Sequence, residues 1–218
     1  MKNLKKIFVA ALFIITTSMA GLQAQNLQDV LSGLGKGGLG TVLNNVLGKS
    51  DVTVADLQGT WTYVEPAVAF KSDNLLKKAG GAAAATTIVN KIKPYYERVG
   101  LNKMELTINA DSTFVMKSGM ATLKGDISKA ADGNFIFNFK ALGKVKVGKM
   151  TAIISKTATG NISLTFDASK LITLVDRIAS ISGVSSLKTV SKMLNSYDGL
   201  NLGFILKKTS AANSRTIR

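Results

Sequence analysis

The chain has 218 residues, a formal net charge of +15 and neither cysteine nor histidine. The lack of cysteine excludes disulfides, thiolate catalysis and lipid attachment through an N-terminal cysteine. The lack of histidine excludes a Ser-His-Asp triad and a His-ligated metal site, and removes the usual proton carrier near neutral pH. We therefore expect a protein that is not an enzyme and that holds no cofactor or metal.

The first residues have the order typical of a secretory signal peptide. Three lysines within the first six residues precede an uncharged stretch, Ile7–Met19, after which small residues gather. This apolar run is too short to span a bilayer. We predict a signal peptide over residues 1–24, with cleavage after Ala24 or after Ala20, and a periplasmic or secreted protein of a Gram-negative bacterium. An N-terminal membrane anchor is the alternative, and no transmembrane segment is expected after processing.

Lysine supplies most of the positive charge. Loss of three lysines with the signal peptide would lower the net charge from +15 to +12, and such a chain is drawn to anionic surfaces. Specific phosphate recognition favours arginine, of which the chain has only four. With export, this argues against nucleic acid as a partner. An anionic envelope surface fits the charge, and a lysine surface that merely aids solubility is the other interpretation.

Residues 25–56 are predicted to form two short helices. Apolar residues recur at helical spacing on both sides of Gly33–Gly40, and glycines at that density interrupt a continuous helix. The apolar stripe needs a cover, which is either the main domain or a membrane or partner surface.

Residues 57–208 alternate between apolar and polar side chains in short stretches, which predicts about eight antiparallel strands. The stretches lie at Trp61–Tyr63, Met104–Ile108, Phe114–Met116, Leu123–Ile127, Phe135–Phe139, Val145–Ile154, Ile162–Phe166 and Leu202–Leu206. A meander of this size buries one apolar face per strand by closing into a barrel. We expect a mainly β protein, with a disordered tail over residues 209–218.

Two helical segments interrupt the predicted strands, at Ser72–Gly100 and at Asp167–Gly199. Pro94 should break or restart the first segment, and Gly183 should break the second. The small residues Gly80–Ala85 suit either a lid over the open end of the barrel or a simple connector. These insertions and the lysine-rich polar faces favour a soluble barrel, apolar inside, over an outer-membrane barrel.

The tripeptide Gly59-Thr60-Trp61 stands at the start of the first predicted strand. A G-x-W there, with a late helix before the closing strand, resembles the lipocalin and wider calycin pattern. It most resembles the lipocalin-like domains of unknown function in exported proteins of Gram-negative bacteria. The resemblance covers about residues 56–208 and implies that Gly59 and Trp61 are structural, with the indole packing the closed end of the barrel. Lipocalins often support this tryptophan with an arginine on a late strand, where this chain has Lys207 and Lys208.

The inward faces of the predicted strands give the candidate site. We expect the barrel to bind one small apolar or amphipathic, lipid-like ligand between Tyr63, Phe114, Met116, Phe135, Phe137, Phe139, Met150 and Phe166. A small barrel can instead be filled by its own side chains. The chain would then be a non-catalytic envelope interaction module with a packed barrel and a basic surface. Glu65 is the one carboxylate expected to point inward, and glycoside hydrolysis ordinarily needs two.

Overall fold

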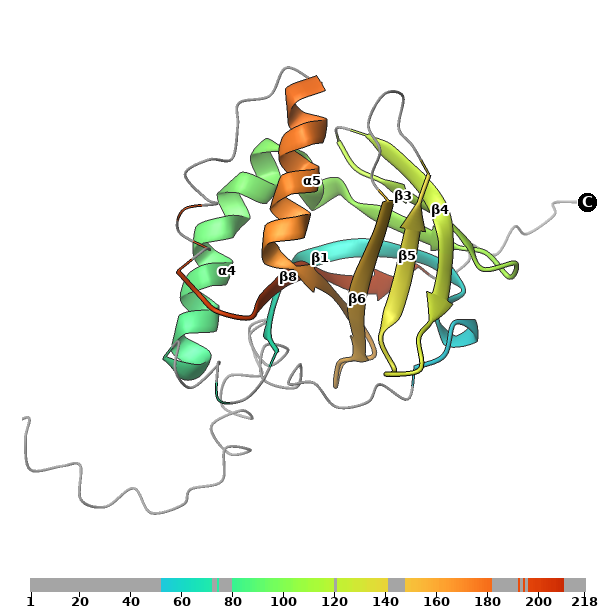
Figure 1. Cartoon of the computed structure of the whole chain (residues 1–218), viewed down its shortest axis with the longest axis horizontal. Coiled ribbons are helices and arrows are strands. Elements are labelled where there is room, and N and C mark those ends of the chain that lie inside the picture. The colour runs from blue at the N-terminus through green and yellow to red at the C-terminus, as the bar shows by residue number, and fades with distance from the viewer. Residues whose placement is uncertain are drawn as a thin grey trace, which may run out of the picture. The chain divides into compact units, whose positions relative to one another are not determined.

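Eight antiparallel strands form a closed barrel in the computed structural model of the protein (Figure 1). The structure describes residues 52–71, 74, 80–119, 121–140, 148–181, 192, 194 and 196–209. Each strand pairs with the next in the chain, and β8 closes on β1. The strands are β1 (Gly59–Phe70), β2 (Glu105–Ile108), β3 (Thr113–Lys117), β4 (Thr122–Lys129), β5 (Phe135–Phe139), β6 (Gly148–Lys156), β7 (Ile162–Asp167) and β8 (Leu200–Lys208).

The predicted signal peptide and N-terminal helices up to residue 51 lie outside the described residues. The same holds for Val145 and Val147, for the break at Gly183 and for the tail beyond Thr209. Thr209 itself still belongs to the barrel, because its N–H donates a 2.8 Å hydrogen bond to the carbonyl oxygen of Thr60.

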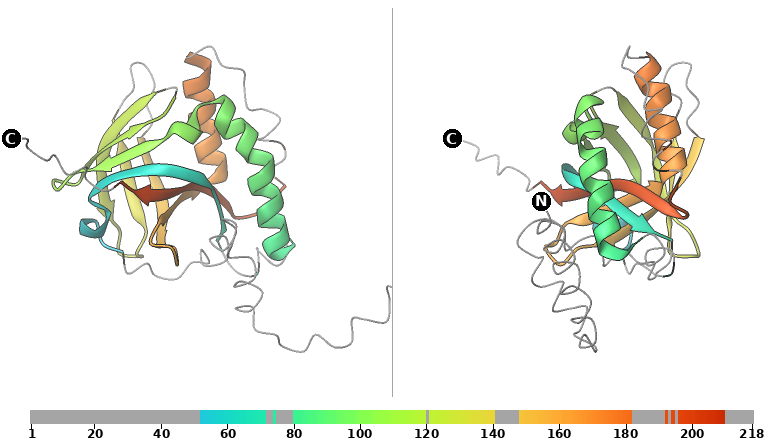
Figure 2. Two further views of the ribbon diagram at one scale, coloured as in Figure 1. Left: turned by 180° about the vertical axis from the view of Figure 1, so that it is seen from behind. Right: turned by 90° about the vertical axis from the view of Figure 1, so that its left-hand side faces the viewer.

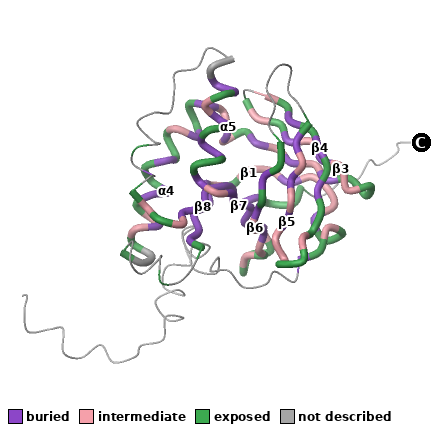
Figure 3. Tube along the Cα trace, viewed as in Figure 1, coloured by how far each residue is buried: buried purple, intermediate pink, exposed green. Residues whose placement is uncertain are grey.

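Alternation of side chains explains most of the barrel. In β5 the side chains of Phe135, Phe137 and Phe139 are buried, whereas Ile136 and Asn138 between them are half-exposed. Figure 3 shows buried and exposed residues alternating in this way along the strands. The apolar faces therefore point into the barrel, as the sequence predicts.

Strand β1 is longer than its alternation suggests. A register shift between Tyr63 and Glu65 bends its pairing with β8, as a β-bulge does. Beyond the shift, all residues from Pro66 to Phe70 are buried. A strand buried on both faces shows no polar alternation, and for this reason the pattern ends at Tyr63 although the strand continues.

Helix α4 (Gly81–Arg98) crosses the outside of β1 and β8 (Figure 2). The hydroxyl of the buried Tyr96 donates a 3.1 Å hydrogen bond to the carbonyl oxygen of Gly203 in β8. The predicted break at Pro94 is wrong, because the helix continues through it. Pro94 and Asn90, whose carbonyl loses its helical partner, are both exposed, so water can satisfy that carbonyl. The residues Gly80–Ala85 start this flanking helix and form no lid.

Helix α5 (Ala168–Ile181) follows β7 directly and lies over one end of the barrel (Figure 1). Short 3-10 turns, η2 (Ala55–Leu57) and η3 (Leu101–Lys103), precede β1 and β2. Among the described residues, neither long helix combines the length and the apolar content that a membrane crossing requires.

The other end of the barrel is closed by Trp61. Its side chain is 4% exposed, and its indole N–H donates a 2.8 Å hydrogen bond to the carbonyl oxygen of Leu57. The ammonium of Lys208 lies 5.3 Å from the centre of the indole ring. Gly59 has a φ of +114°, which disfavours a side chain, and a Cβ there would lie 3.1 Å from Cε of Lys208. The small Gly59 thus leaves room for the lysine that covers Trp61.

Candidate ligand-binding site

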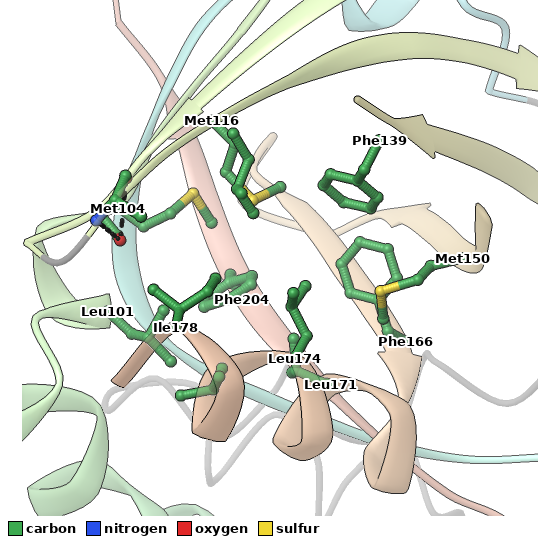
Figure 4. A pocket seen from close by; sticks show the side chains of 14 residues that line it. Leu101, Met104, Met116, Phe139, Met150, Phe166, Leu171, Leu174, Ile178 and Phe204 are labelled. Carbon is green, nitrogen blue, oxygen red and sulfur yellow. Dashed lines mark hydrogen bonds between the residues drawn. The ribbon is translucent and has the colours of Figure 1, made fainter. Parts of the chain in front are cut away.

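An apolar cavity lies between the open end of the barrel and the inner face of α5 (Figure 4). The barrel contributes Met104, Met116, Leu123, Phe139, Met150, Phe166 and Phe204, the turns contribute Leu101, Ser118 and Ala121, and α5 contributes Leu171, Leu174, Val175 and Ile178. Only one of these side chains, that of Ser118, carries a hydroxyl. The lining therefore suits an apolar molecule or an apolar chain.

The cavity exists because α5 presents an apolar stripe to the barrel. Leu171, Leu174 and Ile178 recur at helical spacing and are buried, whereas Lys170 and Arg177 face outward. The sequence predicts this shared face. What it misses is that this stripe covers the barrel mouth, the place for which the sequence offered Gly80–Ala85 as either a lid or a connector. The direct continuation of a barrel strand into an amphipathic helix at Asp167 is the signal that points to it.

Asp167 holds the first turn of α5 at the barrel rim. Its Oδ1 accepts a 3.3 Å hydrogen bond from the backbone N–H of Lys170, as an N-cap does. Its Oδ2 lies 3.0 Å from the ammonium of Lys71, just after β1. Partial burial raises the pKa of Asp167, but these hydrogen bonds outweigh it and lower the pKa below its ordinary value. The carboxylate therefore stays charged and ties the helix to β1.

Four of the predicted site residues line the cavity: Met116, Phe139, Met150 and Phe166. Their side chains enter from β3, β5, β6 and β7 and face α5 (Figure 4). The structure thus brings together residues that lie up to fifty positions apart in the sequence, at one end of the barrel.

The other predicted aromatic residues fill the barrel below the cavity. Phe114, Phe135 and Phe137 are at most 1% exposed and do not line it. The Phe137 ring centre lies 5.0 Å from that of Phe114 and 5.4 Å from that of Phe166, both edge to face. Such contacts belong to a packed core. Among the described residues, the barrel is thus packed around Phe114 and Phe137 and has its apolar cavity under α5.

Tyr63 lies in a separate aromatic cluster. Its ring centre is 6.4 Å from that of Tyr96 in α4 and 6.5 Å from that of Phe204. Burial, with the nearby Glu65 and Glu97 adding to it, raises the pKa of Tyr63. Phe204 connects this cluster to the cavity, whereas Tyr63 does not line the cavity.

The carboxylates of the described residues lie away from the cavity, and two of them stabilise turns. Asp111 and Asp132 each accept a hydrogen bond from the backbone N–H two residues ahead, which is a common role of aspartate in turns. Glu65 is half-buried on β1. Burial raises the pKa of Glu65, and the charge of Lys93 opposes that rise. No carboxylate lines the described cavity.

Comparison with known proteins gives one family. A profile described as "Lipocalin-like domain (DUF4923)" matches residues 31–208. No curated protein and no solved structure matches the chain significantly.

Proposed function

Because the chain belongs to the lipocalin-like domain family DUF4923, we propose that it binds one small apolar or amphipathic, lipid-like molecule under α5. The observation that carries this proposal is the cavity itself. It lies at the open end of the barrel, and its wall is almost entirely aliphatic, aromatic and thioether side chains. Apolar pockets with few polar groups are the usual sites for small ligands.

The cavity must widen to admit a ligand. Its volume is about 30 Å³, which is room for one or two water molecules, whereas ligand pockets usually measure roughly 300–1,000 Å³. Three of the lining residues are Met104, Met116 and Met150. Methionine is unbranched and changes rotamer readily, so a wall rich in methionine can reshape around a guest.

Helix α5 is the part of the wall that can move as a unit. Its cavity face consists of aliphatic side chains, which hold no directional bonds. Its start is tied to the barrel rim by the Lys71–Asp167 ion pair. Outward tilting of the helix about this end would enlarge the cavity without breaking the strand pairing. Lid motions of this kind accompany binding in many proteins.

We also propose that the protein acts outside the cytoplasm and is not an enzyme. The lysine-rich start and short apolar run support export. N-terminal sequencing of the mature protein should find Gln25 or Gly21 first, and an intact Met1 form in the cytosol would contradict export. The lack of histidine and cysteine in the sequence supports a binding role over catalysis.

The binding proposal is tested by filling the cavity. Ala121 lines the cavity and is half-buried, so a phenyl ring introduced by Ala121→Phe would occupy the space of the ligand. We expect wild type to bind an apolar fluorescent dye saturably, and Ala121→Phe to weaken dye binding at least about tenfold, which is about 1.4 kcal/mol. Because the ring is larger than the cavity of about 30 Å³, we expect Ala121→Phe to lower the free energy of unfolding by about 1–3 kcal/mol, the usual cost of overpacking, and to leave the protein folded.

Val64 provides the matched control. It is 47% exposed and is the one large apolar side chain found exposed among the described residues. A dye that merely adheres to the surface would respond to Val64→Ser. Loss of binding in Val64→Ser but not in Ala121→Phe would contradict the proposal. A folded wild type that binds no dye would favour the packed-barrel interaction module instead.

A further inference from the structure

A second hollow, polar and positively charged, lies beside the apolar cavity. It is lined by Lys149, Met150, Ser169, Lys170, Thr173, Leu174 and Arg177 and has a volume of about 270 Å³. One wall is the start of β6, and the other is the outward face of the first turns of α5. We call it the basic groove.

The groove has the chemistry of an anion site. Its lining carries three cationic side chains, Lys149, Lys170 and Arg177, and no carboxylate. None of the three forms an ion pair within 4 Å with a carboxylate of the described residues, in contrast to Lys71, Lys117 and Lys156. Three cations that converge on one hollow favour a negatively charged group there.

The groove and the cavity share a wall. Met150 and Leu174 line both hollows, so these two side chains lie between the cations and the apolar interior. Met150 is flexible, and Leu174 would move with α5. Outward tilting of α5 would therefore join the two hollows into one site, with a charged outer part and an apolar inner part.

This juxtaposition indicates the class of ligand. We propose that the ligand is an anionic single-chain amphiphile, with its carboxylate or phosphate held by Lys149, Lys170 and Arg177 and its apolar chain under α5. The inference rests on the proposed function. A single chain fits better than two because the deeper half of the barrel is already filled by Phe114 and Phe137. Arg177 can hold either headgroup with two parallel hydrogen bonds.

The test compares amphiphiles that differ only in the headgroup. Dodecanoate, dodecyl phosphate and dodecanol are titrated into the full-length chain below their micelle concentrations, with binding followed by calorimetry. We expect one of the two anions to bind about tenfold more tightly than the alcohol, from three exposed ion pairs of modest strength each, and this preference should weaken with salt. The tighter anion identifies the headgroup as carboxylate or phosphate.

A triple variant isolates the groove. Lys149→Gln, Lys170→Gln and Arg177→Gln together should remove the preference for the anions and leave dodecanol binding unchanged. All three side chains are exposed, so the fold should persist, which circular dichroism checks. The matched control is Lys124→Gln, Lys140→Gln and Lys207→Gln. It removes the same charge from exposed positions outside the groove and should keep the preference.

The outcomes separate the two proposals. Equal binding of anions and alcohol by wild type would overturn the anionic headgroup and leave apolar binding intact. An equal loss in the control triple variant would also overturn it, because net charge rather than the groove would then be responsible. Absence of binding for all three amphiphiles would contradict the proposed function itself.

Discussion

The ammonium of Lys208 lies over the ring of Trp61, 5.3 Å from its centre. This contact joins the last strand of the barrel to the first, where Trp61 and Lys208 are also paired in the sheet. A lysine thus supports the tryptophan at the place where lipocalins often have an arginine. Trp61 and Lys208 therefore stabilise the closed end of the barrel together. Neither residue lines the cavity under α5.

Removal of the indole should destabilise the barrel strongly. Trp61→Ala should lower the free energy of unfolding by about 3–5 kcal/mol, as other large core truncations do. Trp61→Phe keeps most of the apolar volume but leaves the Leu57 carbonyl without its N–H donor, and should cost about 1–3 kcal/mol. Urea unfolding measures both. A cost below about 1 kcal/mol for Trp61→Ala would mean that the G-x-W match is accidental.

The lysine cover should contribute less than the indole. Lys208→Ala should cost about 0.5–1 kcal/mol, the range of an exposed cation–π contact. Lys208→Arg should cost less than Lys208→Ala, because a guanidinium also stacks on aromatic rings. The same urea titrations give both values. Equal costs for the two substitutions would contradict a role for the cation.

The deeper half of the barrel should not tolerate a polar residue. Phe137 is fully buried between Phe114 and Phe166, so Phe137→Asn would bury an amide without partners and leave a void. We expect a loss of at least about 3 kcal/mol. Ile136→Asn, on the half-exposed face of the same strand, is the control and should cost much less. Thermal unfolding measures both variants. Similar losses of stability for Phe137→Asn and Ile136→Asn would contradict a packed deeper half of the barrel.

Acid should weaken the segment that precedes β1. Asp56 accepts hydrogen bonds from the Thr53 hydroxyl and backbone N–H, at 2.7 and 2.8 Å, and lies 3.4 Å from the ammonium of Lys156. These contacts, the Thr53 hydroxyl first, lower the pKa of Asp56 from 3.8 to about 2. A lowered pKa means that the charged form stabilises the fold above pH 3.8, and that this contribution is lost as the pH falls through 2.

The comparison of wild type with Asp56→Asn at two pH values tests this. The variant should be less stable at pH 6, and this deficit should be smaller at pH 2, where the Asp56 carboxyl of the folded protein is about half protonated. Thr53→Val, which removes the hydroxyl but keeps the backbone N–H, should show the same trend with a smaller difference. If Asp56→Asn lowered the free energy of unfolding by the same amount at both pH values, the stabilising role of the Asp56 charge would be contradicted.

The sequence predicts the strands with one buried face, because alternation reports such strands directly. It predicts the start of β1 at Gly59 but not its extension to Phe70. The second half of β1 is buried on both faces, so its sequence does not alternate between apolar and polar residues. Pro94 is misleading for a similar reason. A proline inside a helix destabilises it less when water can reach the carbonyl that loses its hydrogen bond, here that of Asn90. Whether water reaches this carbonyl depends on which face of α4 is exposed, and the fold decides that.

The position of the cavity could not be predicted from alternation. All the inward aromatic residues look alike in the sequence, yet Phe137 packs among other rings and Phe139, two residues on, reaches the cavity. The difference depends on height along the barrel axis, which follows from strand register. It also depends on α5, whose apolar stripe is visible in the sequence but whose partner surface is not.

The methyl groups of the cavity methionines give the most direct test of binding under α5. Met104, Met116 and Met150 all line the cavity, and the whole chain has only 7 methionines. Protein labelled with ¹³C at the methionine methyls can be titrated with dodecanoate or dodecanol and followed by NMR, with signals assigned by single Met→Leu variants. We predict that these three signals shift saturably and together. Binding that leaves all three unmoved would contradict the account.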